Sequence, residues 1–159
     1  MATKSEQIEF IKKYWPIAEK AAKKYGLGTM SVLSQAAIES AWGTSYGARV
    51  RNNFHGIIAA GSPNEFWKGE KSQSSSSGLW FRIYKTPLDG FMDHSRLISA
   101  KYPTAKSVSN DTVKYALAIS QSPYISEKNG DDREGYRRGI ISAYNFIQEN
   151  IKTLGLKKK

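Results

Sequence analysis

The sequence predicts an α+β fold, a mostly helical domain with a small β lobe or hairpin inserted after its second helix. Three observations support this fold class. Apolar residues recur every three or four positions in several segments, the period of an amphipathic helix. Residues 43–78 contain six glycines and a run of four serines, and the helical period is lost there. Residues 79–84 then alternate in the manner of a half-buried strand. At 159 residues, we expect a single domain, 1–159, with its β lobe at roughly 53–85.

The N-terminal segment carries the signals of a long helix. Thr3 and Glu6 have capping-box spacing, and Gly26 stands where a left-handed residue commonly ends a helix. Pro16 lies inside this segment, so we expect a kink there or a division into two helices. The expected inward stripe consists of Ile8, Ile11, Trp15, Ala18, Ala22 and Tyr25.

A second helix is expected from Thr29 to about Ala41, where Trp42 and Gly43 end it. The glycines and serines that follow predict loops and short strands instead of a helix. The serine run is interpreted as a loop inside one domain, because too little chain lies on either side of it for two cores.

Three more helices are predicted in the C-terminal half. Thr86 followed by Pro87 is the start signal of one helix, and Asn110 or Asp111 caps the next. The helices carry Phe91 and Ile98 in the first, Val113, Ala116 and Leu117 in the second, and Tyr136, Ile140, Ile141, Tyr144, Ile147 and Ile151 in the last.

The composition excludes several kinds of site. There is no cysteine, which excludes disulfides and thiolate catalysis. The two histidines, His55 and His94, lack the spacing of common metal motifs, so we expect no metal and no cofactor. No run approaches the roughly 18 apolar residues of a membrane span, and we expect no stable membrane insertion.

The charge indicates anionic partners without selecting one. Twenty-four Lys and Arg against 14 Asp and Glu give a net charge of +10, which attracts polyanions. Nucleic acid, an anionic membrane and an anionic wall polymer all fit this charge. Because the lysines are scattered and no recognition-helix pattern is present, we do not expect a nucleic-acid partner.

Glu39 is the carboxyl group with the most unusual setting. On a helical wheel it lies about 20° from Val32 and about 60° from Ala36, at the border of the apolar stripe. Partial burial and the negative end of the helix dipole both raise the pKa of a carboxyl group there. A carboxyl that stays protonated near neutral pH is suited to general-acid catalysis. The alternative is a boundary glutamate bonded to a neighbouring arginine or loop N–H.

The segment QAAIESAWG at 35–43, followed by NNFHGI at 52–57, resembles the signature of the bacterial cell-wall glucosaminidases, which include flagellar peptidoglycan hydrolases and autolysins. FRIY at 81–84 is similar to a strand of that family, and Asp93-His94 to one of its helices. Tyr124 and Tyr136 resemble tyrosines near its C-terminal helix. Because these motifs occur in the family's order along nearly the whole chain, we identify a member of that family.

The resemblance implies a lysozyme-like fold with the glycan in a groove between the two lobes. It implies Glu39 as the catalytic acid and Tyr124 as a residue that assists catalysis or holds the N-acetyl group. Substrate contacts are expected for Trp42, Asn53, Phe54 and Tyr136. For Trp42 the alternative is packing in the core, for Asn53 shaping of a turn, and for Tyr124 anchoring of a loop. Asp93 and His94 are interpreted as hydrogen-bonding between helix and β lobe, and His55 as a packing residue.

A second carboxylate is harder to assign. Glycosidases normally use two, but the stretch WKGEKSQSSSSGLW is rich in serine where the family's second acid is expected. Glu70 is the nearest candidate and Glu65 the next. The alternatives are attack by the substrate's acetamido group and slow turnover by a protein that mainly binds glycan.

The predicted function is hydrolysis of the β-1,4 bond after N-acetylglucosamine in peptidoglycan. The alternatives are a muramidase, a lytic transglycosylase and a non-catalytic wall-binding module. We expect a monomer that binds glycan strands and anionic wall polymers in the cell envelope. With no secretory signal visible, three settings fit: a phage lysin released through holins, an injected effector, and an autolysin domain whose signal has been removed.

Overall fold

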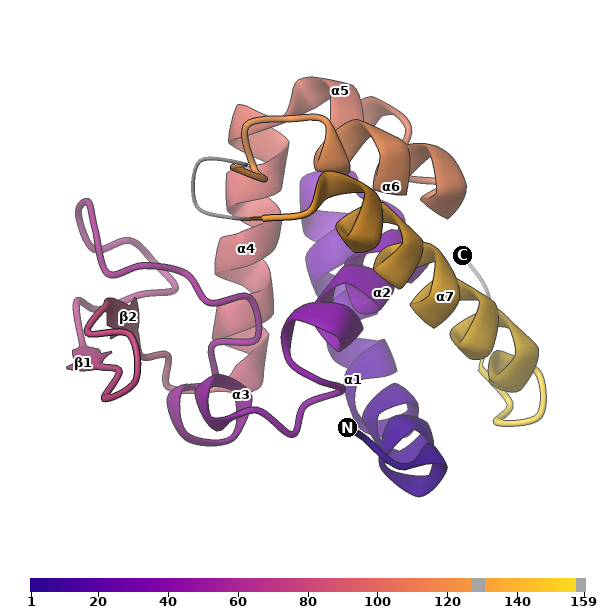
Figure 1. The fold of residues 1–159 in the computed structure, drawn as a ribbon, viewed down its shortest axis with the longest axis horizontal. Coiled ribbons are helices and arrows are strands. Elements are labelled where there is room, and N and C mark those ends of the chain that lie inside the picture. The colour runs from indigo at the N-terminus through magenta and orange to yellow at the C-terminus, as the bar shows by residue number, and fades with distance from the viewer. Residues whose placement is uncertain (127–130, 157–159) are drawn as a thin grey trace.

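In the computed structural model, which describes residues 1–126 and 131–156, most helices gather on one side and a short hairpin lies apart (Figure 1). The helices are α1 (Lys4–Tyr25), α2 (Thr29–Glu39), α3 (Tyr46–Arg51), α4 (Pro87–Lys101), α5 (Pro103–Ser107), α6 (Thr112–Ser120) and α7 (Arg133–Ile151). The strands are β1 (Lys71–Gln73) and β2 (Trp80–Arg82). This arrangement is the predicted α+β class.

Helix α1 follows its capping signals. The Thr3 hydroxyl accepts from the Glu6 N–H at 3.1 Å, and the Glu6 carboxylate accepts from the Thr3 N–H at 2.9 Å. Gly26 ends the helix with φ 67°, where an L side chain would be strained. The expected division at Pro16 is wrong, because α1 is one helix from Lys4 to Tyr25.

Regular strands occupy only a small part of the predicted β lobe. Strands β1 and β2 form an antiparallel pair in which Ser72 faces Phe81, and Ile58 adds one bridge to Phe81. Two short helices, α3 and α5, were not predicted, since five or six residues are too few to show a hydrophobic period. In the predicted strand the buried side chains are Arg82 and Tyr84.

Arg82, Tyr84 and Asp93 join the β lobe to α4. The Asp93 carboxylate is 1% exposed and accepts from Arg82 Nη1 at 2.7 Å, from Arg96 Nη2 at 2.9 Å and from the Tyr84 hydroxyl. Asn64 Nδ2 donates to the same carboxylate at 3.0 Å. These bonds confirm the interpretation of Asp93 as a contact between helix and lobe, and they hold the lobe at a defined position.

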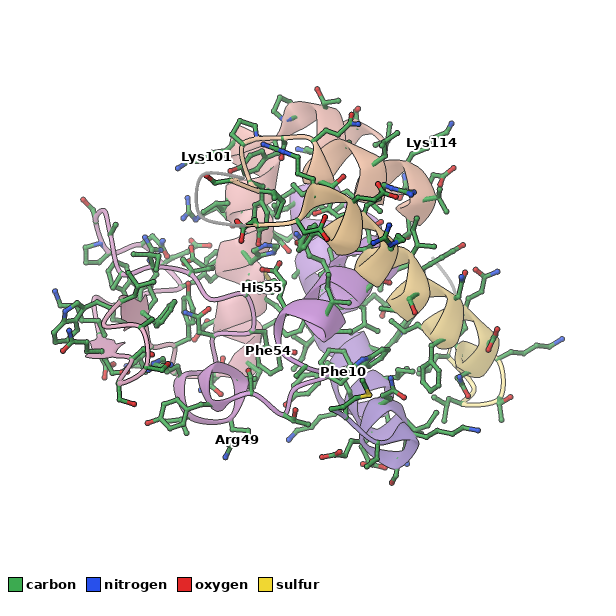
Figure 2. The ribbon with its side chains drawn as sticks, viewed as in Figure 1. Phe10, Arg49, Phe54, His55, Lys101 and Lys114 are labelled. Carbon is green, nitrogen blue, oxygen red and sulfur yellow. The ribbon has the colours of Figure 1, made fainter. Side chains whose placement is uncertain are left out.

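The core lies between α1, α2, α4, α6 and α7. Helix α2 packs against both α1 and α7, so most of its side chains are buried. Phe10 of α1 and Phe54, which follows α3, come together in this core with ring centroids 6.4 Å apart (Figure 2). Two apolar residues of α6, Val113 and Leu117, are 47% exposed, because α6 turns the Ala116 side inward. Among the described residues, no helix is long and apolar enough to cross a membrane.

Candidate active site

Glu39 is the last residue of α2, two residues earlier than the helix end expected from the sequence. The chain then turns sharply, since Ala41 and Trp42 have φ values of 49° and 55°. Residues other than glycine rarely adopt this left-handed backbone conformation, which costs about 1–3 kcal/mol per residue. Ser40 is fully buried and stabilises the turn, donating to Ala36 O at 2.7 Å and accepting from the Gly43 N–H at 2.8 Å.

Two tyrosines orient the Glu39 carboxyl group. The hydroxyls of Tyr124 and Tyr136 donate to the same oxygen, Glu39 Oε2, at 2.8 and 2.9 Å. Tyr124 precedes the described start of α7, and Tyr136 lies in its first turn. No described residue hydrogen-bonds the other oxygen, Oε1. The two oxygens therefore have different surroundings, with Oε2 held by the protein and Oε1 available to a ligand.

Burial raises the pKa of Glu39 from 4.5 to about 7. Hydrogen bonds from Tyr124 and Tyr136, together with the neighbouring Gln35 amide, act in the opposite direction, because they stabilise the carboxylate, and the negative charge of Asp131 raises the pKa further. Burial outweighs the hydrogen bonds because the donors are neutral and no cation in the described part of the chain pairs with Glu39. The carboxyl group is therefore about half protonated at neutral pH.

A hydrogen-bond chain through Gln35 positions Tyr136. Tyr115 donates to Gln35 Oε1 at 2.5 Å, and Gln35 Nε2 donates to the Tyr136 hydroxyl oxygen at 2.8 Å. Tyr136 has a single proton, and this bond directs it toward Glu39. Gln35 is 1% exposed, so the chain is built into the core between α2, α6 and α7.

Two stacked histidines support Tyr124 from the other side. His94 Nε2 lies 3.0 Å from the Tyr124 hydroxyl, and the His94 and His55 rings are parallel with centroids 3.5 Å apart. Burial lowers the pKa of His94 to about 3, so its ring is neutral. Because the Tyr124 hydroxyl donates its hydrogen bond to Glu39, it accepts one from His94, and the network assigns the Nε2–H tautomer to His94. His55, labelled in Figure 2, packs on Phe91 as well as on His94, which fits its interpretation as a packing residue.

Glu39 lies where two cavities meet. The larger cavity, about 650 Å³, is lined by residues of both lobes, including Ile57, Tyr102, Tyr124 and Tyr136. Its volume is within the range of ligand-binding clefts. The smaller cavity, about 180 Å³, shares Glu39 and Gly56 with the larger one and continues toward α3 and Phe81. A polymer that occupies both cavities would pass directly over Glu39.

The sequence around this site is similar to that of a known family. Residues 15–149 match the sequence model of the Glucosaminidase family, described as mannosyl-glycoprotein endo-beta-N-acetylglucosaminidase. The chain belongs to this family. The match confirms the family that the motifs predict.

Individual relatives agree with this assignment. The peptidoglycan hydrolase FlgJ of Vibrio parahaemolyticus is 28% identical over 139 residues, 78% of this chain and 44% of the relative. The chain thus spans less than half the length of that relative. The glycoside hydrolase domain of Salmonella typhimurium FlgJ is similar with a TM-score of 0.72 at 22% identity, covering 94% of this chain and 92% of that one. The catalytic domain of the autolysin Auto from Listeria monocytogenes has a TM-score of 0.66 at 24% identity, covering 93% and 89%. These structures confirm the fold.

Several predicted substrate-contacting residues are structural in this member of the glucosaminidase family. Phe54 is 1% exposed and packs on Tyr14, with ring centroids 4.8 Å apart, so it lies in the core and lines neither cavity. Trp42 packs edge-on against Phe10 and Phe146 and also lies outside both cavities. Asn53 borders the smaller cavity, but its amide bonds to Ile57 O, Arg82 O and Ile57 N. These three contacts hold the turn before the β lobe.

In the structure Tyr124 and Tyr136 hydrogen-bond to Glu39, whereas Glu70 lies away from it. Glu70 is exposed immediately before β1 and lines neither cavity, and its backbone carbonyl accepts from Trp67 Nε1 at 2.7 Å. Asp131 and Asp132 line the larger cavity with Glu39, although sequence reasoning did not select them. Two aspartates before a helix are an ordinary N-cap signal, and Asp132 does cap α7 through the Gly135 N–H at 2.9 Å.

Proposed function

We propose that the protein is a peptidoglycan hydrolase that cleaves the β-1,4 bond after N-acetylglucosamine, with Glu39 as the general acid. One observation carries this proposal. The Glu39 carboxyl has a pKa of about 7, one oxygen held by two tyrosines, and the other oxygen without a hydrogen bond to a described residue where two cavities meet. The muramidase and transglycosylase alternatives would use the same acid on the neighbouring bond.

In this mechanism the two oxygens of Glu39 have separate tasks. Oε1 carries the proton and gives it to the glycosidic oxygen as the bond to the anomeric carbon breaks. Glu39 then becomes negatively charged, and the hydrogen bonds from Tyr124 and Tyr136 to Oε2 strengthen because their acceptor is ionised. The tyrosines therefore stabilise the state that follows proton transfer more than the state before it.

Asp131 is the carboxylate best placed to stabilise the positive charge that develops on the sugar. It lines the larger cavity and lies near enough to Glu39 to raise its pKa. Its Oδ2 accepts from the Ser126 N–H at 3.2 Å, which orients the side chain. Glu70 does not line the cavity, so a catalytic role for its carboxylate is supported by the sequence alone. Participation of the substrate's acetamido group is compatible with Asp131 in this place.

The proposed partners are glycan strands of peptidoglycan and, through the net charge of +10, anionic polymers of the cell wall. This places the proposed site of action in the cell envelope. The fold and the charge fit a phage lysin, an injected effector and a catalytic domain of a larger autolysin equally well.

The product ends of digested peptidoglycan test the proposal. Purified wall is treated with wild type, Glu39→Gln, Asp131→Asn and Glu70→Gln, and muropeptides are identified by mass spectrometry. New reducing N-acetylglucosamine ends support the proposal, whereas muramic or anhydro-muramic ends support the alternatives. Comparing Asp131→Asn with Glu70→Gln shows which carboxylate the reaction needs.

A wall-binding module makes the opposite prediction. If the protein binds wall without cleaving it, Glu39→Gln and wild type bind sacculi equally and neither clears a wall suspension. In the proposed enzyme, Glu39→Gln binds sacculi as wild type does but loses clearing.

A further inference from the structure

The smaller cavity beside Glu39 contains a buried cation that the proposed mechanism does not use. Arg51, the last residue of α3, lines this cavity together with Glu39, Ser45 and Phe81. Its side chain is well covered, since the residue is only 7% exposed. A guanidinium group is always charged at physiological pH, so its partners decide whether it is structural or available to a ligand.

The protein orients Arg51 without neutralising it. The guanidinium carbon lies 4.8 Å from the centroid of the Tyr46 ring and 5.2 Å from that of Phe81, so two aromatic rings pack against its planar group. Arg51 Nε donates to Ser72 Oγ at 2.7 Å, a bond that joins α3 to β1. These contacts fix the orientation of the guanidinium plane and use the Nε–H donor, but they leave the donors of the two terminal amino groups unused.

The terminal amino groups of Arg51 have no acidic partner among residues 1–126 and 131–156. A Cβ built on Gly47 would lie 4.0 Å from Nη1, so this nitrogen lies close to the glycine backbone that also lines the cavity. The contrast with Arg82 is direct, because the buried Arg82 guanidinium pairs with Asp93 at 2.7 Å. A buried cation without an anion is unfavourable, and a ligand that brings an anion to it gains affinity.

Peptidoglycan provides such an anion next to every bond that could be cleaved. Each β-1,4 bond joins one N-acetylglucosamine to one N-acetylmuramic acid, and the latter carries a lactyl group that is either a free carboxylate or joined to a stem peptide. The stem peptide has carboxylates of its own. Chitin, which has the same backbone with N-acetylglucosamine throughout, has none.

We propose that Arg51 binds a carboxylate of the muramic residue adjacent to the scissile bond, and so selects peptidoglycan over chitin. This inference rests on the proposed function and adds an orientation to it: the muramic sugar lies on the side of Glu39 where the smaller cavity is. The lactyl group and the stem peptide are two sources of the same carboxylate chemistry, and the experiment distinguishes them.

The test compares three oligosaccharides: glycan strands with stem peptides, the same strands after amidase treatment has freed the lactyl carboxylates, and chitin oligosaccharides of equal length. Binding is measured with Glu39→Gln protein, and cleavage with the active enzyme. Arg51→Met keeps the apolar stem between the rings and removes the charge, while Arg51→Lys keeps the charge. Arg49→Met, an exposed cation two residues away, is the matched control for net charge.

Arg51→Met is expected to weaken binding of the muramic substrates about 10- to 100-fold, because a hydrogen bond to a charged group contributes about 1.5–3 kcal/mol. KM rises on the same substrates. Chitin binding is expected to stay within about twofold of the parent protein. Arg49→Met removes the same charge outside the cavity, so it is expected to weaken the two anionic substrates only slightly, through the loss of long-range attraction, and to leave chitin unchanged. A loss confined to stripped strands identifies the lactyl carboxylate, and a loss confined to strands with peptides identifies the stem.

Equal loss on chitin and on muramic substrates would overturn the proposal, since Arg51 would then only maintain the shape of the lobe. Thermal unfolding of Arg51→Met and partial rescue by Arg51→Lys separate a folding defect from a recognition defect. Because binding is measured in the Glu39→Gln protein, the result stands even if wild type releases no N-acetylglucosamine ends, an outcome that would refute the proposed function alone.

Discussion

Two carboxyl groups, Glu39 half-buried at the centre of the cleft and Asp93 buried at the junction of the lobes, have pKa values shifted in opposite directions. Burial raises the pKa of both, but at Asp93 the hydrogen bonds from Tyr84, Arg96 and Arg82 outweigh it and the pKa falls below its ordinary value. At Glu39 the bonding partners are neutral hydroxyls, and the pKa stays at about 7. Two guanidinium groups bond Asp93, and no guanidinium of the described residues bonds Glu39, so the charge of the partners contributes to the opposite shifts.

The same comparison applies to the regions around them. One oxygen of Glu39 accepts no hydrogen bond from a described residue, and the residue lies beside a turn with left-handed backbone. Asp93 instead accepts hydrogen bonds on both oxygens, from Arg96 of α4, Arg82 of β2 and Asn64. The junction at Asp93 therefore holds the two lobes in place, and the cleft at Glu39 keeps its binding capacity for substrate.

The largest effect is expected at the cleft. Glu39→Gln should lower the rate of wall hydrolysis about 10²- to 10⁴-fold, the usual contribution of general-acid catalysis. Muropeptide release per unit time measures this, with Glu9→Gln, an exposed residue of α1, as the control. If Glu39→Gln retained more than a tenth of the wild-type rate, Glu39 would not be the acid.

At the junction, Asp93→Asn should cost stability instead. It leaves the buried Arg82 guanidinium without an anion, and loss of one partner of a buried pair costs about 3–5 kcal/mol. Chemical unfolding gives the value. Glu134→Gln, which removes surface ion pairs with Arg137 and Arg138, should change the free energy of unfolding far less. Similar losses for the two variants would show that burial of the Asp93 pair is unimportant.

The two carboxyl groups should also give opposite dependences of stability on pH. Between pH 4.5 and about 7 the native state binds more protons at Glu39 than the unfolded state does, so the free energy of unfolding falls as pH rises. The full effect is at most about 3 kcal/mol. Asp93 acts in the other direction: its contribution is present above pH 3.8 and is lost as pH falls through its lowered pKa.

Unfolding measured across this range in wild type and in Glu39→Gln isolates the contribution of the glutamate. The difference between the two proteins should change between pH 4.5 and about 7 and be constant outside that interval. A difference that is the same at every pH would mean that Glu39 titrates normally.

The smallest effect is expected from one tyrosine. Tyr124→Phe removes a hydrogen bond to the Glu39 carboxylate, so the pKa of Glu39 rises and the basic limb of the pH–rate profile moves to higher pH. The maximal rate should fall about tenfold, from the lower range of a charge-assisted hydrogen bond. Tyr102→Phe is the control, since Tyr102 lines the same cavity and its ring packs edge-on against Tyr124. Equal profiles for the two variants would contradict a role for the Tyr124 hydroxyl.

Much of the fold was accessible from local signals. Thr3, Thr86 and Asp111 cap the helices that their sequence positions predict, because a cap requires only a side chain and an N–H three residues later. Pro16 was expected to kink the helix or to divide it, and the division does not occur because packing of the flanking residues in the core keeps α1 continuous. Helices α3 and α5 are too short to be recognised from periodicity.

In the candidate site, too, some features could be predicted from the sequence and others could not. The position of Glu39 at the edge of an apolar helix and close to its end was enough to predict a raised pKa, since the apolar stripe indicates which side of a helix becomes buried. Phe54 and Trp42 could not be assigned from the chain alone, because an aromatic beside a catalytic motif packs into the core or lines the cleft depending on the direction of its backbone.

The amino-acid sequence carries the family, the helical caps and the position of the proposed acid, because each of these depends on residues that are neighbours along one segment. Which groups surround that acid is a matter of long-range contact: Tyr124 and Tyr136 reach Glu39 across 85 and 97 positions of the chain. The aspartates in the cavity and the uncompensated Arg51 became visible only in three dimensions. Charge and solvent access depend on what lies nearby in space, and distance along the chain does not measure that.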